Sequence, residues 1–147
     1  MFDKKHIGHK FEPYDVEVEK GAVRLFAKAI GETNPVNTDD KAARAAGHRS
    51  IVAPLTFIAS LVALSPHYFP VAALLGFSEE NVLHVGQEYE YFGEICVGDR
   101  LTLQETIVDI FDKKNGTLNF VISETVLRNP KGELVALSRE TIMVREG

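Results

Sequence analysis

The sequence has few of the features that mark nucleic-acid-binding and secreted proteins. Its 16 Lys and Arg are outnumbered by 21 Asp and Glu, which gives a formal net charge of -5, and no run of basic residues is longer than Lys113–Lys114. Because clustered positive charge is what binds a phosphate backbone, we expect no nucleic-acid partner. The first five residues lead into polar sequence without the apolar stretch of a secretory signal, so we expect a cytoplasmic protein.

Long apolar runs and paired cysteines are also missing. Residues 51–77 are strongly apolar, but Pro54, Pro66 and Pro70 interrupt them. The uninterrupted part, roughly 11 residues, is shorter than the about 20 that a bilayer requires, so we expect no membrane span. The one cysteine, Cys96, has no Cys or His at metal-ligand spacing, and the five histidines are scattered. We therefore expect neither a metal nor a cofactor, and interpret Cys96 as a small buried hydrophobe.

The residues that are present predict helices first and then a sheet. With 45% hydrophobic and 25% charged residues, the 147 residues fit a single domain, 1–147. Apolar residues recur at helical spacing up to about Phe77 and alternate, as in strands, from Val85 to Val144. A first helix opens at Glu19 and is stopped by Gly31, and Thr38 is placed to cap a second one.

The third predicted helix decides the fold class. It begins near Ala53–Pro54, since proline is tolerated in a first turn, and runs to Leu64. Its apolar residues cover nearly every side, so we expect it to be enclosed on all sides. The alternating segments, joined by turns such as the predicted two-residue turn at Asn115–Gly116, supply antiparallel strands. These features predict an α+β hot-dog fold, an antiparallel curved sheet wrapped around a central apolar helix.

Three segments, in order along nearly the whole chain, resemble the MaoC-like hydratases and dehydratases. Residues 26–37, FAKAIGETNPVN, resemble the motif in which a helix ends in Gly-Asp-x-Asn-Pro-(Leu/Ile/Val)-His. Residues 47–57, GHRSIVAPLTF, are similar to the N-terminal-type domains of the family, which include the substrate-binding subunits of heterodimeric (3R)-hydroxyacyl-ACP dehydratases. Residues 83–91 and 97–101 resemble the strand and turn that follow the central helix.

The resemblance places the catalytic positions on Glu32 and Asn37. In the active relatives an Asp and a His at these positions hold a water and act as general base and acid on an enoyl thioester. Asparagine cannot titrate, and the Glu32 carboxylate lies one methylene further out, where a misplacement near 1 Å can cost about 100-fold in rate. We therefore expect the proton-transfer pair to be missing. The alternative is that both are turn and cap residues after a helix.

The relatives also bind the thioester oxygen with a backbone N–H at the start of the central helix, helped by the helix dipole. The resemblance places that helix start on residues 53–56, where Ala53 keeps an N–H and Pro54 has none. His84 and Gln87 begin the following strand, near where a neighbouring subunit or the pantetheine arm would lie. A core-helix proline and a rim histidine bonded to a carbonyl remain the alternative interpretations. The candidates for substrate binding are Ala53, Pro54, Leu55, Thr56, His84 and Gln87.

Three functions follow from the resemblance. The first is an acyl-thioester-binding subunit of a (3R)-hydroxyacyl-CoA or -ACP dehydratase or an enoyl hydratase, a hydro-lyase whose catalytic MaoC-type partner supplies Asp and His. The second is a homo-oligomeric enzyme, a thioesterase or a hydratase that uses Glu32. The third is a non-enzymatic acyl-CoA-binding protein. Each implies an acyl-CoA or acyl-ACP ligand and a homodimer or heterodimer, because hot-dog sheets cover their edge strands by pairing.

Overall fold

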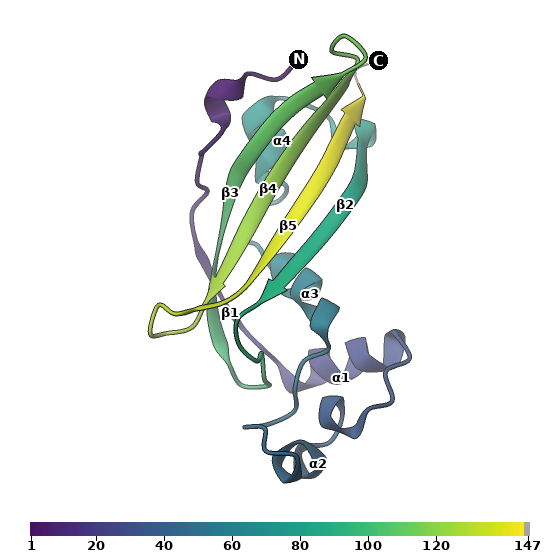
Figure 1. Cartoon of the computed structure of the whole chain (residues 1–147), viewed down its shortest axis with the longest axis vertical. Helices are drawn as coiled ribbons and strands as arrows, with labels where there is room; N and C mark the ends of the chain where they lie inside the picture. The colour runs from purple at the N-terminus through teal and green to yellow at the C-terminus, as the bar shows by residue number, and fades with distance from the viewer. Residues whose placement is uncertain (146–147) are drawn as a thin grey trace.

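Five antiparallel strands form one curved sheet in the computed structural model, which describes residues 1–145 (Figure 1). Their order across the sheet is β1-β3-β4-β5-β2, so the two edges are β1 and β2. The strands are β1 (Tyr14–Glu17), β2 (Val82–Tyr91), β3 (Arg100–Lys113), β4 (Leu118–Arg128) and β5 (Leu134–Arg145). The sheet and its helices confirm the predicted α+β hot-dog fold.

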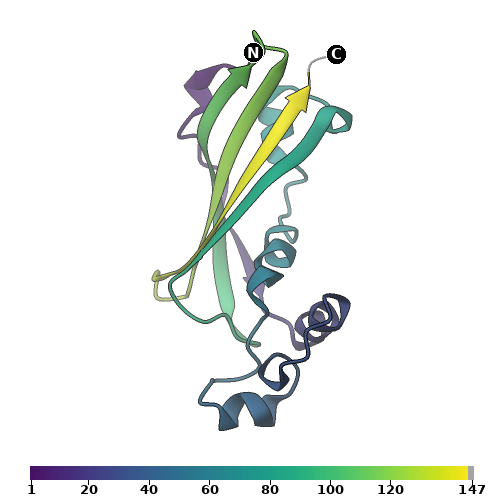
Figure 2. The ribbon, with the colours of Figure 1, turned by 45° about the vertical axis from the view of Figure 1, so that its right-hand side comes forward.

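The helices fall into two groups. Helices α3 (Ile58–Val62) and α4 (Pro70–Leu75) lie one after the other on the concave side of the sheet, whereas α1 (Lys20–Ala29) and α2 (Asp40–Ala45) lie beyond one end of it (Figures 1 and 2). Four short 3-10 helices complete the elements: η1 (Lys4–His6), η2 (Pro35–Asn37), η3 (Leu55–Phe57) and η4 (Glu79–Asn81).

The first two helices form for the local reasons that the sequence indicates, with one correction. Glu19 precedes α1, and Gly31 follows it with a φ of 72°, the left-handed conformation that glycine adopts at little cost. The N-cap of α2 is Asp39 rather than Thr38, because the Asp39 carboxylate accepts a hydrogen bond of 3.0 Å from the Ala42 N–H. An Asp and a Thr side by side are both good caps, and the prediction chose the wrong one.

The predicted central helix is divided. It starts as η3, continues as α3, and stops at Val62 before Pro66 and Pro70. Phe57, Ile58 and Leu61 are buried against the sheet, but Leu55 is 67% exposed and Leu64 is 58% exposed. The expectation that this helix is enclosed on all sides is therefore wrong for the single chain, whose sheet covers only one side of the helix.

Two strand boundaries also differ from the prediction. The turn between β3 and β4 has four residues, 114–117, instead of two, and Lys114, Asn115 and Gly116 all have positive φ. Strand β2 begins at Val82, three residues before Val85, where the predicted alternation begins. Cys96 is fully buried, as predicted for a small hydrophobe.

The core consists of two apolar clusters along the concave face of the sheet. The first lies between the sheet and α1, η3 and α3, and includes Phe57, Leu61, Leu103 and Leu127. The second lies under α4 and includes Val71, Ile107 and Ile142. Between the two clusters the inward side chains of β3, β4 and β5 are polar, and this interruption coincides with the gap between α3 and α4.

Candidate functional site

The side chains at the two expected catalytic positions are both bonded to backbone. Asn37 is only 8% exposed, and its Nδ2 donates a hydrogen bond of 2.7 Å to the Val52 carbonyl. The Glu32 carboxylate accepts one of 2.8 Å from the Asn34 N–H, two residues along the chain. Glu32 therefore makes the contact of a turn residue. Asn37 holds the backbone of Val52, in the segment that leads into η3, from a buried position.

The backbone around η3 shows which amides remain available. The Val52 N–H donates to the Val36 carbonyl over 3.0 Å, and the Ala53 N–H donates to the Ile95 carbonyl over 2.8 Å. The Ala53 N–H is therefore engaged in this conformation, although the sequence assigned it to the ligand. Pro54 has no N–H, and within residues 1–145 no group accepts from the N–H of Leu55 or Thr56. These two are the first amides of η3, as expected at a helix start.

A small hollow adjoins the first of these two residues, Leu55. It has a volume of about 210 Å³ and is lined mainly by apolar groups, among them Pro54, Phe57, Tyr91 and Ile95. The Tyr91 hydroxyl donates a hydrogen bond of 2.6 Å to the Leu55 carbonyl, which ties β2 to η3. Of the predicted residues 53–56, Ala53, Pro54 and Leu55 thus line one apolar hollow with Tyr91 of β2, and Thr56 is not part of its lining.

His84 and Gln87 lie together on the inner side of β2, in a second group. His84 Nε2 is 3.1 Å from Gln87 Oε1 and 3.6 Å from a carboxylate oxygen of Glu140 on β5. Gln87 Nε2 donates to Ser138 Oγ over 2.8 Å and to the Arg139 carbonyl over 3.2 Å. His84 is therefore bonded to side chains, and it belongs to a polar network that extends from the sheet edge inward.

The sequence analysis missed a polar cavity at the gap between α3 and α4. It has a volume of about 320 Å³, and its polar lining includes Tyr14, Glu105, Ser123 and Glu140 from four different strands. Burial raises the pKa of the Glu105 carboxyl; the hydrogen bond from Ser123 opposes this rise and the charge of Glu140 adds to it. The sequence does carry a sign of this cavity: polar residues stand at core-facing positions of the strands, where the alternating pattern leads one to expect apolar residues.

Tyr14 connects this cavity to the helix above it. Its hydroxyl donates a hydrogen bond of 3.0 Å to the carbonyl of Val62, the last residue of α3. Burial, together with the nearby charge of Glu105, raises the pKa of Tyr14 to about 12, so the hydroxyl keeps its proton at neutral pH. The end of α3 is held by a group that also faces the polar cavity.

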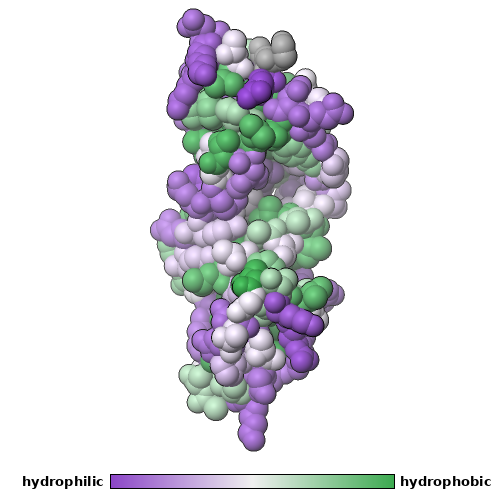
Figure 3. Space-filling model, turned by 90° about the vertical axis from the view of Figure 1, so that its right-hand side faces the viewer, coloured by the Kyte–Doolittle hydropathy of each residue, from purple (hydrophilic) through white to green (hydrophobic). Residues whose placement is uncertain are grey.

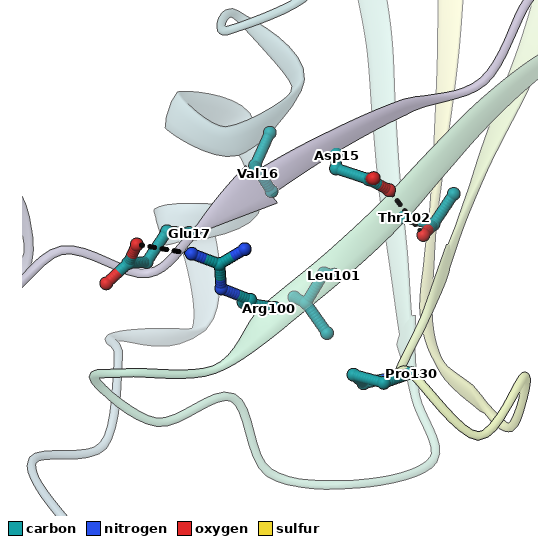
Figure 4. Close-up of a pocket in the computed structure, with 7 residues that line it drawn as sticks. All are labelled: Asp15, Val16, Glu17, Arg100, Leu101, Thr102 and Pro130. Carbon is teal, nitrogen blue, oxygen red and sulfur yellow. Dashed lines mark hydrogen bonds and ion pairs between the residues drawn. The ribbon is translucent and has the colours of Figure 1, made fainter.

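A larger hollow of about 500 Å³ lies by β1 and the start of β3 (Figure 4). Its polar side chains are paired with one another: Thr102 Oγ1 donates to Asp15 over 2.6 Å, and Arg100 lies 3.6 Å from Glu17. Each of these four polar side chains thus has a partner among the other three, and the hollow offers no polar group without one.

Within residues 1–145 no three His, Cys, Asp or Glu side chains are grouped so that they could hold a metal ion. The helices of this part of the chain are all too short or too polar to cross a membrane.

Comparison with known proteins now gives the family. Residues 5–138 match the family model described as the FAS1-like dehydratase domain region. The chain belongs to this family. A UPF0336 protein of Streptomyces griseus is 32% identical over 146 residues, which cover 97% of this chain and 95% of that one. A probable enoyl-CoA hydratase alpha subunit of Thermomonospora curvata is 30% identical over 132 residues, 80% of this chain but 41% of that one.

A solved structure of similar fold is a complex, the C-terminally truncated HadBC (3R-hydroxyacyl-ACP dehydratase) of Mycobacterium tuberculosis. One of its chains matches with a TM-score of 0.78 and 24% identity, over 94% of this chain and 96% of that one. The resemblance to MaoC-like hot-dog dehydratases is thus confirmed for the fold and for the family.

Proposed function

We propose that this chain is the acyl-thioester-binding subunit of a (3R)-hydroxyacyl-CoA or -ACP dehydratase or enoyl hydratase, and that a MaoC-type partner supplies the Asp and His. The observation that carries this proposal is the state of Asn37. At the position where the active relatives have their histidine, this side chain is buried and donates to the Val52 carbonyl. It has no proton to exchange and is not free to turn toward a water.

The residues around η3 are suited to hold the thioester instead. The N–H groups of Leu55 and Thr56 have no acceptor within residues 1–145 and lie at the positive end of a helix. A carbonyl oxygen that gains enolate character is stabilised by such donors. With the Ala53 N–H bonded to Ile95, this role falls two or three residues later than the sequence comparison places it. The apolar hollow beside Tyr91 takes the first part of the acyl group.

Strand β2 offers the surface for the partner. It is an edge strand with β5 as its only neighbour among residues 1–145, and Leu83, Val85 and Phe92 at and after it are exposed. Apolar and polar side chains are mixed on the face of the molecule on which β2 lies (Figure 3). Unpaired strand edges with apolar side chains favour pairing with another strand. The similarity to one chain of the HadBC complex supports a heterodimer.

Co-expression with a MaoC-type subunit that carries Asp and His tests the proposal. The purified mixture is expected to hydrate crotonyl-CoA and longer enoyl-CoAs faster than the partner alone, with the larger gain on the longer chains. A mixture no faster than the partner would contradict the proposal.

The variant Glu32→Gln separates this function from a homo-oligomeric enzyme. Because the Glu32 carboxylate is bonded to the Asn34 N–H, we expect the variant complex to keep the wild-type rate. Replacement of the partner's catalytic Asp by Asn, the corresponding amide, is the matched control and should abolish activity. If Glu32→Gln removes activity while the partner is intact, this chain supplies its own base.

A further inference from the structure

The concave face of the sheet is covered by two short helices with a gap between them. Helix α3 ends at Val62 and α4 begins at Pro70. Between them the Ser65 hydroxyl accepts from the His67 N–H over 3.2 Å, and Phe69 takes a left-handed φ of 41°, which a non-glycine residue adopts only when its surroundings hold it there. The gap is therefore a built feature of the chain.

A cavity lies under this gap, where the face on the β2 side is hollowed (Figure 3). Its volume of about 320 Å³ lies within the about 300–1,000 Å³ usual for ligand sites. The rim is largely apolar and comes from the ends of the two helices, for example Val62, Phe69 and Val71. One continuous helix along the sheet would fill this space.

The floor of the cavity is polar, unlike the clusters on either side of it. Ser123 of β4 stands opposite Glu140 of β5 in the ladder and is only 8% exposed. Its hydroxyl lies near Glu105 of β3, where hydrogen bonding from Ser123 lowers the pKa of that carboxyl against the effect of burial. The polar row continues outward from Glu140 to Gln87, its ladder partner on β2. It therefore runs from the middle of the sheet to the edge at which we propose that the partner pairs.

The two carboxylates of the row differ in their partners. Glu140 lies 3.6 Å from His84, whereas Glu105 forms no salt bridge within residues 1–145. A hydrocarbon chain laid over Glu105 would remove water from the carboxyl group and give it no hydrogen bond in return. A chain with a hydroxyl group at that point would replace the water. Sites built to bond a substrate hydroxyl discriminate strongly against the analogue that lacks it.

We propose that this cavity receives the chain of the acyl thioester and prefers chains that carry a hydroxyl group over unsubstituted hydrocarbon chains, with Glu105 and Ser123 as the hydrogen-bonding partners. This inference rests on the proposed function and adds a substrate class to it. The hydroxyl group and the amides of the pantetheine arm offer similar chemistry, so the test must separate the two sources.

Isothermal titration of the full-length chain with matched acyl-CoAs makes that separation. The probes are octanoyl-CoA, dodecanoyl-CoA and their ω-hydroxy counterparts. All four carry the same pantetheine arm, and the two members of each pair differ only in the terminal group of the acyl chain. For at least one chain length we expect the hydroxylated form to bind about ten-fold more tightly or better, a modest fraction of what a dedicated hydroxyl site achieves. Equal affinity within both pairs would overturn the inference and leave the proposed function standing.

The variants Glu105→Leu and Glu105→Gln identify the residue responsible. Leucine should abolish or reverse the preference, whereas glutamine, whose amide oxygen still accepts a hydrogen bond, should keep part of it. Glu80→Leu, on the exposed η4, is the matched control and should keep the wild-type preference. If Glu105→Leu does not fold, as judged by circular dichroism, Ser123→Ala replaces it and should reduce the preference.

Two further outcomes count against the inference. A Glu105→Leu variant that binds both members of a pair more weakly by the same factor would assign the polar row to the pantetheine arm. Absence of binding by every acyl-CoA would overturn the proposed function as well, because that function requires the chain to hold an acyl thioester.

Discussion

At the scale of single residues, two polar side chains, the buried Asn37 and the half-buried Glu105, have opposite roles. Asn37 donates a hydrogen bond to the Val52 carbonyl and so holds the backbone in place. The pKa of the Glu105 carboxyl is raised, because burial disfavours its charged form. A polar group that is fully satisfied stabilises the fold, and one that is poorly solvated is kept for another reason. Stability measurements distinguish the two roles.

Replacing Asn37 by Ala should destabilise the protein. The substitution leaves the buried Val52 carbonyl without its donor, which costs about 1–3 kcal/mol. Urea unfolding followed by circular dichroism measures the change. Thr33→Ala, at an exposed neighbour, is the control and should stay within about 0.5 kcal/mol of wild type. A loss for Asn37→Ala no larger than the control's would mean that the clamp on Val52 contributes nothing.

Replacing Glu105 by Gln should change how stability depends on pH. A carboxyl whose folded-state pKa is raised binds its proton more tightly in the native than in the unfolded chain. Its contribution to stability therefore increases as the pH falls through the raised pKa toward the ordinary value of 4.5, and it is unfavourable at neutral pH. We expect the variant to melt at a higher temperature than wild type at neutral pH, and the difference to shrink on acidification.

Thermal melts of both proteins across this pH range provide the measurement, with Glu80→Gln as the exposed control. A difference between wild type and Glu105→Gln that does not vary with pH would show that the carboxyl titrates alike in the folded and unfolded chains.

At the scale of elements, α3 is buried on one side only. Leu61 is almost fully buried in the first core cluster, whereas Leu55, six residues earlier in η3, is 67% exposed. Leu61→Ala should therefore cost about 2–5 kcal/mol and Leu55→Ala less than about 0.5 kcal/mol in the single chain. Urea unfolding of the two variants compares them directly, and similar losses would mean that the helix is enclosed on both sides, as its sequence alone suggests.

The sequence predicts elements whose causes are local, and misses what depends on register. Glu19 and Gly31 define α1, and alternating residues define β3 to β5, because caps and periodicity act within a few residues. The gap between α3 and α4 was not predicted, since an apolar run looks the same whether one helix or two bury it. Glu105 and Ser123 were missed because only the pairing of strands places them over one cavity.

At the scale of the whole molecule, one edge of the sheet is β2, which has β5 as its only neighbouring strand within residues 1–145. Val85 on β2 is 49% exposed and lies at a bulge between His84 and Gly86. Val85→Lys should weaken association with a second subunit by about ten-fold or more, because charge on an edge strand opposes pairing. Light scattering of the co-purified complex over a dilution series measures this effect.

Val108→Lys is the matched control. Val108 is 37% exposed and, like Val85, lies at a bulge, but it belongs to β3, which β4 and β5 separate from the β2 edge, so this variant should assemble like wild type. Weaker assembly of both variants, or of Val108→Lys alone, would move the interface away from the β2 edge.

The divided helix has one more consequence. Pro66 and Pro70 confine the interruption to a short connecting segment, and the sheet beneath it runs on without a break. The connection lines the cavity together with the strands, so its length limits the space that opens above them. Under the proposed function, insertions or deletions there would change which acyl chains fit without altering the residues at η3, and substrate range could diversify through a single loop.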